Sequence, residues 1–354
     1  MSNPMDIQRA IDIIGRFGHL QEDEAENVMN QIMRGEAHES QIGAYLMGLR
    51  MKGETEAEIV GSARAIRGHA VRIPIQSQGD LLDTCGTGGD GSGTFNISTA
   101  TAFAAAGAGV RIAKHGNRAV TGTCGSADVL AELGMSLDLT PEQVGRCVDE
   151  IGIGFFFAPR VHPAMRHAVE TRRHIGVRTI FNILGPLTNP AGSNRQLTGV
   201  FAPDLTDFLA GILGLLGSSE AMVVCGYGNM DELTTTGPNR VSHYRDGEVH
   251  TYDLSPLDFD LERAHISDLQ GGDPSTSARI LRGVLSATEN GARRDVVLFN
   301  TAAALVAGGA VADIREGLEV ARESIGSGRA VAKLDLLVEM SNDLSKTDGR
   351  WGGR

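Results

Sequence analysis

Cysteine, basic residues and long apolar runs are scarce in this sequence, and each shortage excludes a class of protein. The four cysteines show no CxxC spacing and no matched histidines, so free thiols in a reducing cytoplasm are expected rather than a zinc site or disulfides. No apolar run reaches the roughly 18 residues that span a bilayer, and the first residues show no secretion signal. We therefore expect a cytoplasmic protein with no membrane partner.

Basic residues are outnumbered by acidic ones. The chain of 354 residues has 32 lysines and arginines against 44 aspartates and glutamates, which gives a net charge of −12. A nucleic-acid-binding domain is normally basic, so we expect no nucleic-acid partner, although a local positive pocket is compatible with this charge. The length and the 41% hydrophobic content are typical of a globular protein with one large or two unequal domains.

Acidic residues are nevertheless missing from one interval. Between Asp90 and Asp128 there is no aspartate or glutamate, whereas Arg111, Lys114 and Arg118 lie inside that interval. An interval of this length without acids is unusual in an acidic chain. It is compatible with a site that receives phosphate groups.

The residues around this interval predict an anion-binding loop. An apolar pair at 81–82 predicts the end of a strand, and a loop with five glycines follows between 86 and 93. We expect a helix over 99–106, with Ser98 or Thr99 as its N-cap, and a second strand over 110–113. Glycine amides and a helix N-terminus both bind anions, so this arrangement favours a phosphate ligand.

Two other interpretations of the glycine loop are less favoured. Residues 86–91 match the dinucleotide fingerprint G-x-G-x-x-G, but the acidic residue expected about 20 positions later is absent. The second strand leads instead to Lys114 and His115. A glycine-rich turn without a ligand would not need so many glycines beside Asn, Ser and Thr.

The chain order indicates a helical unit followed by an α/β domain. Residues 1–72 carry apolar residues at helical spacing, and residues 72–78 form a linker candidate. The α/β domain begins at about residue 79 and extends to 354. We expect a mostly parallel central sheet flanked by helices in this larger domain.

Arg172 is a candidate ligand-binding residue. A helix is expected from Pro163, and its spacing places Met165, Ala168, Val169 and Arg172 on one largely apolar face. A guanidinium on such a face needs a partner, because burying an unpaired charge is costly. The spacing alone leaves two partners equally open, a substrate carboxylate or a protein aspartate or glutamate.

Asp231 and Glu232, called the acid pair below, are candidate metal ligands. They follow a short loop after an apolar strand at 221–225. Paired carboxylates beyond a strand are a typical Mg²⁺ arrangement, since this ion prefers oxygen ligands together with substrate phosphates. A solvated acidic turn is the alternative.

Several of these segments resemble the motifs of the anthranilate phosphoribosyltransferases. GTGGD at 86–90, NIST at 96–99, KHGNR at 114–118 and GSAD at 125–128 occur in the order and spacing of that family. Further similarity extends over nearly the whole chain, at 157–173, 178–190 and 231–238. The chain departs from the family at 121–124, where TGTC replaces a segment that usually has more serines.

The resemblance implies the reaction of anthranilate with 5-phosphoribosyl 1-pyrophosphate, which gives N-(5-phosphoribosyl)anthranilate and pyrophosphate in tryptophan biosynthesis. It also implies a homodimer, Mg²⁺ as cofactor, and a helical domain completed by helices around 163–185. The residues implied to bind the phosphoribosyl donor are Gly86, Gly89, Asp90, Thr94, Asn96, Ile97, Ser98, Thr99, Lys114, His115, Gly116, Asn117, Arg118, Gly122 and Ser126. Those implied for anthranilate are Gly86, Asn117, His162 and Arg172. Those implied for the metal are Ser98, Asp231 and Glu232.

No residue is expected to be an essential catalytic base, although His115 is the candidate proton acceptor. Two rival functions are considered. A pyrimidine nucleoside phosphorylase has the same overall fold but needs one phosphate site, which the acid pair and the NIST segment disfavour. A nucleic-acid-binding relative without activity is disfavoured by the net charge.

Overall fold

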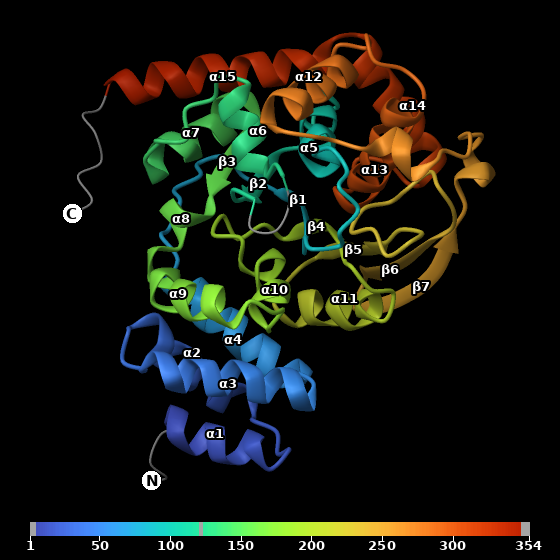
Figure 1. The fold of residues 1–354 in the computed structure, drawn as a ribbon. Coiled ribbons are helices and arrows are strands. Elements are labelled where there is room, and N and C mark those ends of the chain that lie inside the picture. Colours follow the sequence, from blue (N-terminus) through green and yellow to red (C-terminus); the bar gives the residue numbers. More distant parts are fainter. Residues whose placement is uncertain (1–4, 120–122, 348–354) are drawn as a thin grey trace. The chain divides into compact units, whose positions relative to one another are not determined.

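The computed structural model describes residues 5–119 and 123–347, and the chain divides into two compact units. The helical unit comprises residues 1–71 and 159–190, and the α/β unit comprises residues 72–158 and 191–354. Figure 1 colours the chain from its N-terminus to its C-terminus. No helix in the described part of the chain has both the length and the hydrophobicity needed to cross a membrane.

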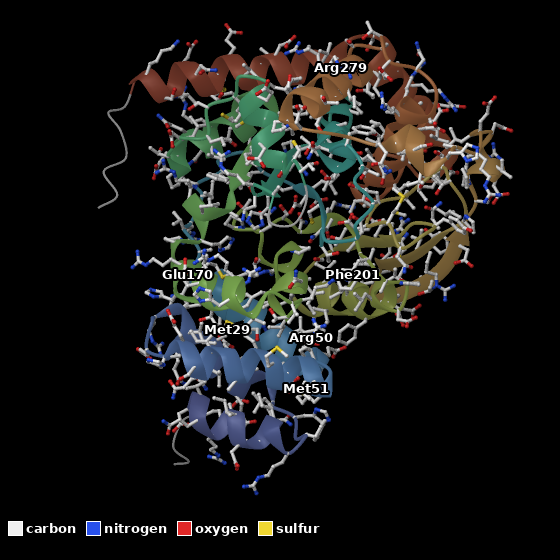
Figure 2. The ribbon with its side chains drawn as sticks, viewed as in Figure 1. Met29, Arg50, Met51, Glu170, Phe201 and Arg279 are labelled. Atoms are coloured by element: carbon white, nitrogen blue, oxygen red, sulfur yellow. The ribbon has the colours of Figure 1, made fainter. Side chains whose placement is uncertain are left out.

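The helical unit is held by a core of aliphatic side chains and well-capped helices. Met29 is fully buried in this core, whereas Met51 is 73% exposed at the end of its helix (Figure 2). Thr55 and Glu58 form a capping box at the start of the fourth helix. The helices are α1 (Ile7–Gly15), α2 (Glu22–Met33), α3 (Glu39–Lys52), α4 (Glu56–His69), α8 (Ala158–Val161, at the boundary), α9 (Arg166–Ile175) and α10 (Phe181–Leu184), with 3₁₀ turns at Pro163–Met165 and Pro186–Thr188.

The α/β unit is built on one seven-stranded sheet in the order β3-β2-β1-β4-β5-β6-β7. The first five strands in this order are parallel, and β6 and β7 are antiparallel additions at one edge. The strands are β1 (Leu82–Gly86), β2 (Ile112–Gly116), β3 (Ile153–Phe157), β4 (Arg195–Gly199), β5 (Glu220–Cys225), β6 (Asn239–Arg245) and β7 (Glu248–Leu254). The expected mostly parallel sheet is therefore confirmed.

Helices cover the sheet of the α/β unit, as Figure 1 shows. Helices α5 and α13 pack on β1 and β4, and α11 packs on β5 and β6. The helices of this unit are α5 (Ile97–Gly107), α6 (Ser126–Glu132), α7 (Pro141–Ile151), α11 (Leu205–Leu215), α12 (Pro274–Leu285), α13 (Ala292–Ala307), α14 (Ile314–Gly326) and α15 (Arg329–Thr347), with 3₁₀ turns at Pro256–Phe259 and Ile266–Leu269. Parallel strands covered in this way bring their carboxyl ends to a single edge of the sheet.

Local expectations were wrong where contacts from distant residues decide the structure. Helix α5 begins at Ile97, and the position before it is Asn96, not Ser98 or Thr99. The N–H of Ser98 donates instead to Glu232, so a distant carboxylate caps this helix. The second strand was expected to end at Ala113, but β2 continues to Gly116 because Lys114 and His115 pair with β3.

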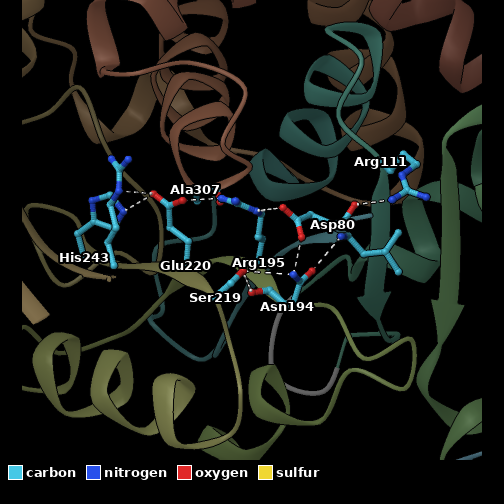
Figure 3. A network of polar contacts seen from close by, with 10 residues as sticks. Asp80, Arg111, Asn194, Arg195, Ser219, Glu220, His243 and Ala307 are labelled. Atoms are coloured by element: carbon cyan, nitrogen blue, oxygen red, sulfur yellow. Dashed lines mark hydrogen bonds and ion pairs between the residues drawn. The ribbon is translucent and has the colours of Figure 1, made fainter. Parts of the chain in front are cut away.

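A polar network joins the amino ends of the strands (Figure 3). Arg195 at the start of β4 forms ion pairs with Asp80 (2.6 Å) and with Glu220 at the start of β5 (2.5 Å). Glu220 also contacts His243 of β6 at 2.9 Å. Asn194 donates to the Asp80 carboxylate at 2.6 Å. This network lies at the edge of the sheet opposite to the carboxyl ends of the parallel strands.

Candidate active site

The glycine loop and the acid pair meet at the carboxyl ends of the parallel strands. The N–H of Gly88 donates to Oδ2 of Asp231 at 2.7 Å. The N–H of Ser98, in the first turn of α5, donates to Oε1 of Glu232 at 3.0 Å. Two segments more than 130 residues apart in the chain therefore share one small volume. This edge of an α/β sheet is where ligands usually bind.

Two strand ends have glycine because the acid pair packs directly against them. A Cβ at Gly86, the last residue of β1, would lie 2.3 Å from Oδ2 of Asp231. A Cβ at Gly199, the last residue of β4, would lie 1.5 Å from the carbonyl oxygen of Asp231. Any side chain at these positions would displace the acid pair.

The backbone amides that could bind an anion donate hydrogen bonds to carboxylates of the protein itself. Glycine-loop amides and the N-terminus of α5 offer partial positive charge, and Asp231 and Glu232 accept hydrogen bonds there. Nearby, the Asn96 side-chain amide donates to the carbonyl of Cys124 at 3.1 Å. Its buried Oδ1 has no hydrogen-bond partner among the described residues, and neither does Oγ1 of Thr99. The site thus has amide donors and orphaned polar atoms together.

Lys114 supplies a buried positive charge beside the acid pair. Its side chain is 3% exposed, and its Nζ donates to the carbonyl of Thr84 at 2.5 Å and to Oγ of Ser98 at 3.4 Å. Burial lowers the pKa of this amine, and the negative charges of Asp83 and Glu232 oppose that effect. A buried amine is therefore held beside the acid pair.

Burial also perturbs both carboxyls of the acid pair. It raises the pKa of Asp231 to about 7, with repulsion from Asp90 adding to the effect and the hydrogen bond from Gly88 opposing it. The pKa of Glu232 lies well above its usual value because of burial and the nearby Asp231. Two such acids favour the gain of positive charge, either as protons or as a cation.

The other loop residues surround this centre. Asp90 accepts from the N–H groups of Ser92 (3.0 Å) and Asp231 (3.3 Å), so it links the glycine loop to the acid pair. Thr94 pairs with Gln270, and the Ile97 side chain is fully buried, which leaves Ile97 only backbone atoms for a ligand. Gly89 has a positive φ of 72°.

The segment after β2 is held by an ion pair. Arg118 contacts Asp128 at 2.8 Å, and Asp128 also accepts from the N–H groups of Ala119 and Gly125. Burial alone would raise the pKa of Asp128, but these bonds hold that pKa below its usual value. Ser126 donates to the carbonyl of Asn117 at 3.3 Å, and a Cβ at Gly116 would meet its Oγ. Gly122, which was predicted to bind the phosphoribosyl donor, lies outside the described residues.

His115 is joined to the strand beside it. Its backbone N–H donates to Oδ1 of Asp83 at 3.1 Å, and Asp83 is fully buried on β1. Asp83 did not figure in the sequence analysis. A charged residue directly after the apolar pair Leu81 and Leu82, at the start of an expected strand, was the signal that could have revealed it.

Arg172 and His162 belong to the helical unit, whereas Gly86 and Asn117 belong to the α/β unit. The Arg172 guanidinium lies 4.8 Å from the centre of the Phe181 ring. Burial lowers its pKa, and no described aspartate or glutamate forms an ion pair with it. The helix face is less buried than expected, since Val169 is 48% exposed. Among the described residues, the protein partner considered for Arg172 is therefore not found.

The other predicted anthranilate ligand of this unit is deeply buried. His162 is 6% exposed and hydrogen-bonds to the backbone of Thr188. Burial lowers its pKa to about 4 despite that hydrogen bond. It is therefore a neutral imidazole near pH 7.

Comparisons with known proteins agree with this geometry. Residues 8–70 match the helical bundle domain and residues 78–331 the α/β domain of a glycosyl transferase family. The anthranilate phosphoribosyltransferase of Symbiobacterium thermophilum is 54% identical over 92% of this chain and 95% of its own length. The chain belongs to the anthranilate phosphoribosyltransferase family. The anthranilate phosphoribosyltransferase of Syntrophotalea carbinolica is 47% identical over 95% of this chain and 99% of its own length.

Solved anthranilate phosphoribosyltransferases have the same fold. The enzyme of Thermus thermophilus superimposes with a TM-score of 0.89 at 41% identity, over 94% of this chain and 99% of that chain. The Saccharomyces cerevisiae enzyme in complex with PRPP and Mg has a TM-score of 0.88 at 28% identity, over 96% of this chain and 98% of that chain. These relatives support the transferase interpretation and not the phosphorylase or nucleic-acid-binding alternatives.

Proposed function

We propose that the chain transfers the phosphoribosyl group of 5-phosphoribosyl 1-pyrophosphate to anthranilate and releases pyrophosphate. The observation that carries this proposal is the meeting of the glycine loop, the N-terminus of α5 and the acid pair. A diphosphate needs amide donors, and its associated cation needs carboxylates, so both parts of one ligand are provided for in one place.

We assign donor binding to the α/β unit, from about residue 79 to 354. Lys114, the glycine-loop amides and Ser98 lie around the acid pair and would bind the diphosphate. The helical domain, residues 1–72 with helices around 163–185, would supply His162 and Arg172 for anthranilate. The Arg172 guanidinium has no ion-pair partner in the described part of the chain, and the anthranilate carboxylate would provide one.

Mg²⁺ fits the donor set of this site. The hydroxyl of Ser98 and the carboxylates of Asp231 and Glu232 are hard oxygen ligands, which this ion prefers. No group of three or more histidines, cysteines, aspartates and glutamates in the described residues could hold a metal ion alone. The remaining ligands would come from the substrate phosphates and water, and the ion would supply neutralisation of the diphosphate charge.

The residue types follow from the chemistry of the reaction. The ribose C1 becomes positively charged as pyrophosphate leaves, so catalysis depends on stabilising the negative leaving group. The glycine-loop amides and Lys114 would do this. The aromatic amine of anthranilate is neutral and needs orientation, a role that we propose for Asn117 and Arg172. His115 is the candidate acceptor for the proton that the amine loses.

Pyrophosphate release from purified protein tests the proposal. With anthranilate and the phosphoribosyl donor, release should require both substrates and should stop when Mg²⁺ is chelated. Phosphorolysis of uridine and thymidine is the parallel assay for the phosphorylase alternative. Nucleoside cleavage without anthranilate-dependent pyrophosphate release would contradict the proposed activity.

A homodimer in the cytoplasm, with tryptophan biosynthesis as its role, completes the proposal. Growth without tryptophan of a bacterial strain that lacks this activity, when it expresses the chain, is the expected result. Light scattering should give twice the mass of the 37.4 kDa chain.

A further inference from the structure

Two buried asparagines bind the backbone that follows the acid pair. Oδ1 of Asn300, on α13, accepts from the N–H of Leu233 at 3.0 Å, and its Nδ2 donates to the carbonyl of Leu233 at 2.7 Å. Asn239, at the start of β6, does the same for Thr234, with distances of 2.7 and 3.0 Å. Both asparagines are fully buried. We call these four hydrogen bonds the asparagine clamp.

Each asparagine offers the complementary donor and acceptor that a neighbouring strand would offer. A pair of bonds to both backbone groups of one residue restricts its position and its rotation more than a single bond does. Leu233 and Thr234 are consecutive, and their two asparagines come from different elements. The peptide between them is therefore held from a helix and from a strand.

The buried Asn300 side chain would destabilise the fold if its hydrogen bonds were not made. It lies within α13, where every residue from Val296 to Ala307 is buried. Asparagine is a weak helix former, and a buried amide without partners is strongly unfavourable. Its Nδ2 also donates to the carbonyl of Val296 at 2.8 Å. All three hydrogen bonds of the Asn300 side chain thus go to backbone groups, and two of them go to Leu233.

Glycines also pack against the backbone of the acid pair. A Cβ at Gly199 would lie 1.5 Å from the carbonyl oxygen of Asp231, and one at Gly226 would lie 2.3 Å from that of Glu232. The backbone of the acid pair therefore packs against the ends of β4 and β5. The clamp begins at the very next residue.

We propose that Asn300 and Asn239 are positioning residues that determine how tightly the acid pair binds its divalent cation. This inference rests on the proposed function, in which Asp231 and Glu232 hold that cation. Two carboxylates must meet the ion and the diphosphate together, so a small backbone displacement weakens binding. Groups that orient metal ligands typically change metal affinity by about 10- to 100-fold when removed.

Binding of inorganic pyrophosphate at increasing Mg²⁺ concentrations, measured by calorimetry, tests the proposal without turnover. Asn300→Ala should raise the Mg²⁺ concentration for half-maximal binding by about tenfold or more. In the active enzyme it should leave the KM for anthranilate unchanged. Asn300→Ser keeps one hydrogen-bonding group and should show a smaller increase, and this variant decides the question if Asn300→Ala does not fold.

Gln143 provides a matched control for the loss of a buried amide. Its side chain accepts from the N–H of Thr140 (2.9 Å) and donates to the carbonyl of Leu344 (2.8 Å), both outside the site. Gln143→Ala should lower the melting temperature and leave the Mg²⁺ midpoint unchanged. If Asn300→Ala behaves in the same way as Gln143→Ala, the asparagine is only structural and the inference is overturned.

A third variant separates this inference from the proposed function. Asp231→Asn combined with Glu232→Gln should abolish the Mg²⁺ dependence of pyrophosphate binding. If it does and both Asn300 variants keep the wild-type midpoint, only the positioning role fails. If the double variant itself keeps the wild-type midpoint, the metal assignment fails and the positioning role fails with it.

Discussion

Lys114 in the α/β unit and Arg172 in the helical unit are each held in an environment that is unfavourable for a positive charge. Lys114 is buried beside Glu232, and Arg172 is half-buried over Phe181 with no carboxylate partner among the described residues. Such arrangements cost stability in the free protein. Residues with perturbed pKa values cluster at functional sites, so both residues are candidates for binding a ligand of opposite charge.

Arg172→Ala is expected to weaken anthranilate use specifically. The fall in kcat/KM for anthranilate should correspond to about 2–4 kcal/mol of activation free energy, the range for removing a buried charged contact. The melting temperature should change little, because no protein carboxylate in the described residues loses an ion pair. Arg173→Ala is the control on the same helix, since Arg173 is exposed and contacts Glu170 at 2.7 Å. A large drop in melting temperature with an unchanged KM for anthranilate would refute the substrate role.

His162 should make stability depend on pH. Its pKa is about 4 in the folded protein and near 6.5 in the unfolded chain, so below pH 6.5 the unfolded chain binds the extra proton. The contribution to stability is therefore complete above pH 6.5 and is lost as the pH falls towards 4, by about 3 kcal/mol. Urea unfolding between pH 7.5 and 4.5 measures this slope. His162→Gln should flatten it, and an unchanged slope would assign the effect to other groups.

At the scale of elements, strand ends and one helix end create the site. Helix α5 has no side-chain cap of its own at Asn96, and the strands β1 and β4 end in glycines. Glu232 accepts from the first turn of α5, and Asp231 packs against both glycines. The acid pair therefore substitutes for a ligand at these element ends.

Replacing Asp231 and Glu232 together by alanine is expected to abolish turnover at every Mg²⁺ concentration. The fold should persist, because both acids have raised pKa values and lose little favourable interaction when removed. The measurements are kcat over a Mg²⁺ series and the melting temperature. Replacing the exposed Asp204 and Asp207 by alanine is the control for the loss of two carboxyl groups elsewhere. Near-normal kcat in the double variant of the acid pair would remove the metal assignment.

At the scale of the whole molecule, the two edges of the sheet in the α/β unit have different tasks. The carboxyl edge has buried acids, orphaned polar atoms and glycines. The amino edge has the paired network of Arg195, Asp80 and Glu220 (Figure 3). The paired network and the candidate site thus lie at opposite ends of the same strands.

Glu220→Ala should destabilise the protein without changing its kinetics. It removes one of the two carboxylates that pair with the largely buried Arg195 guanidinium, and Asp80 remains as the other. The loss should cost about 2 kcal/mol in the free energy of unfolding. The KM values and the Mg²⁺ requirement should stay at their wild-type values, since Glu220 lies at the far edge. Asp253→Ala breaks the exposed pair with Arg240 and should cost less than about 1 kcal/mol. Urea unfolding and steady-state kinetics compare the two variants.

The sequence by itself determined the features that depend on local chemistry. Glycines at 86–93, the absence of acids between Asp90 and Asp128, and an acid pair after an apolar strand were all evident from the residues. Backbone freedom and charge are properties of a residue, so their spacing along the chain suffices. The resemblance of the motifs to a known family implied the fold with a mostly parallel sheet, and the structure has that sheet.

Only the tertiary structure decided what depends on partners far away in the chain. The start of α5 was misplaced because its cap is Glu232, and β2 was too short because its polar tip pairs with β3. Asn300 gave no sign of its partner, since nothing in a run of apolar helix residues says which backbone it will meet. Hydrogen-bond partners are set by packing, and packing joins residues whose sequence separation carries no information about their contact.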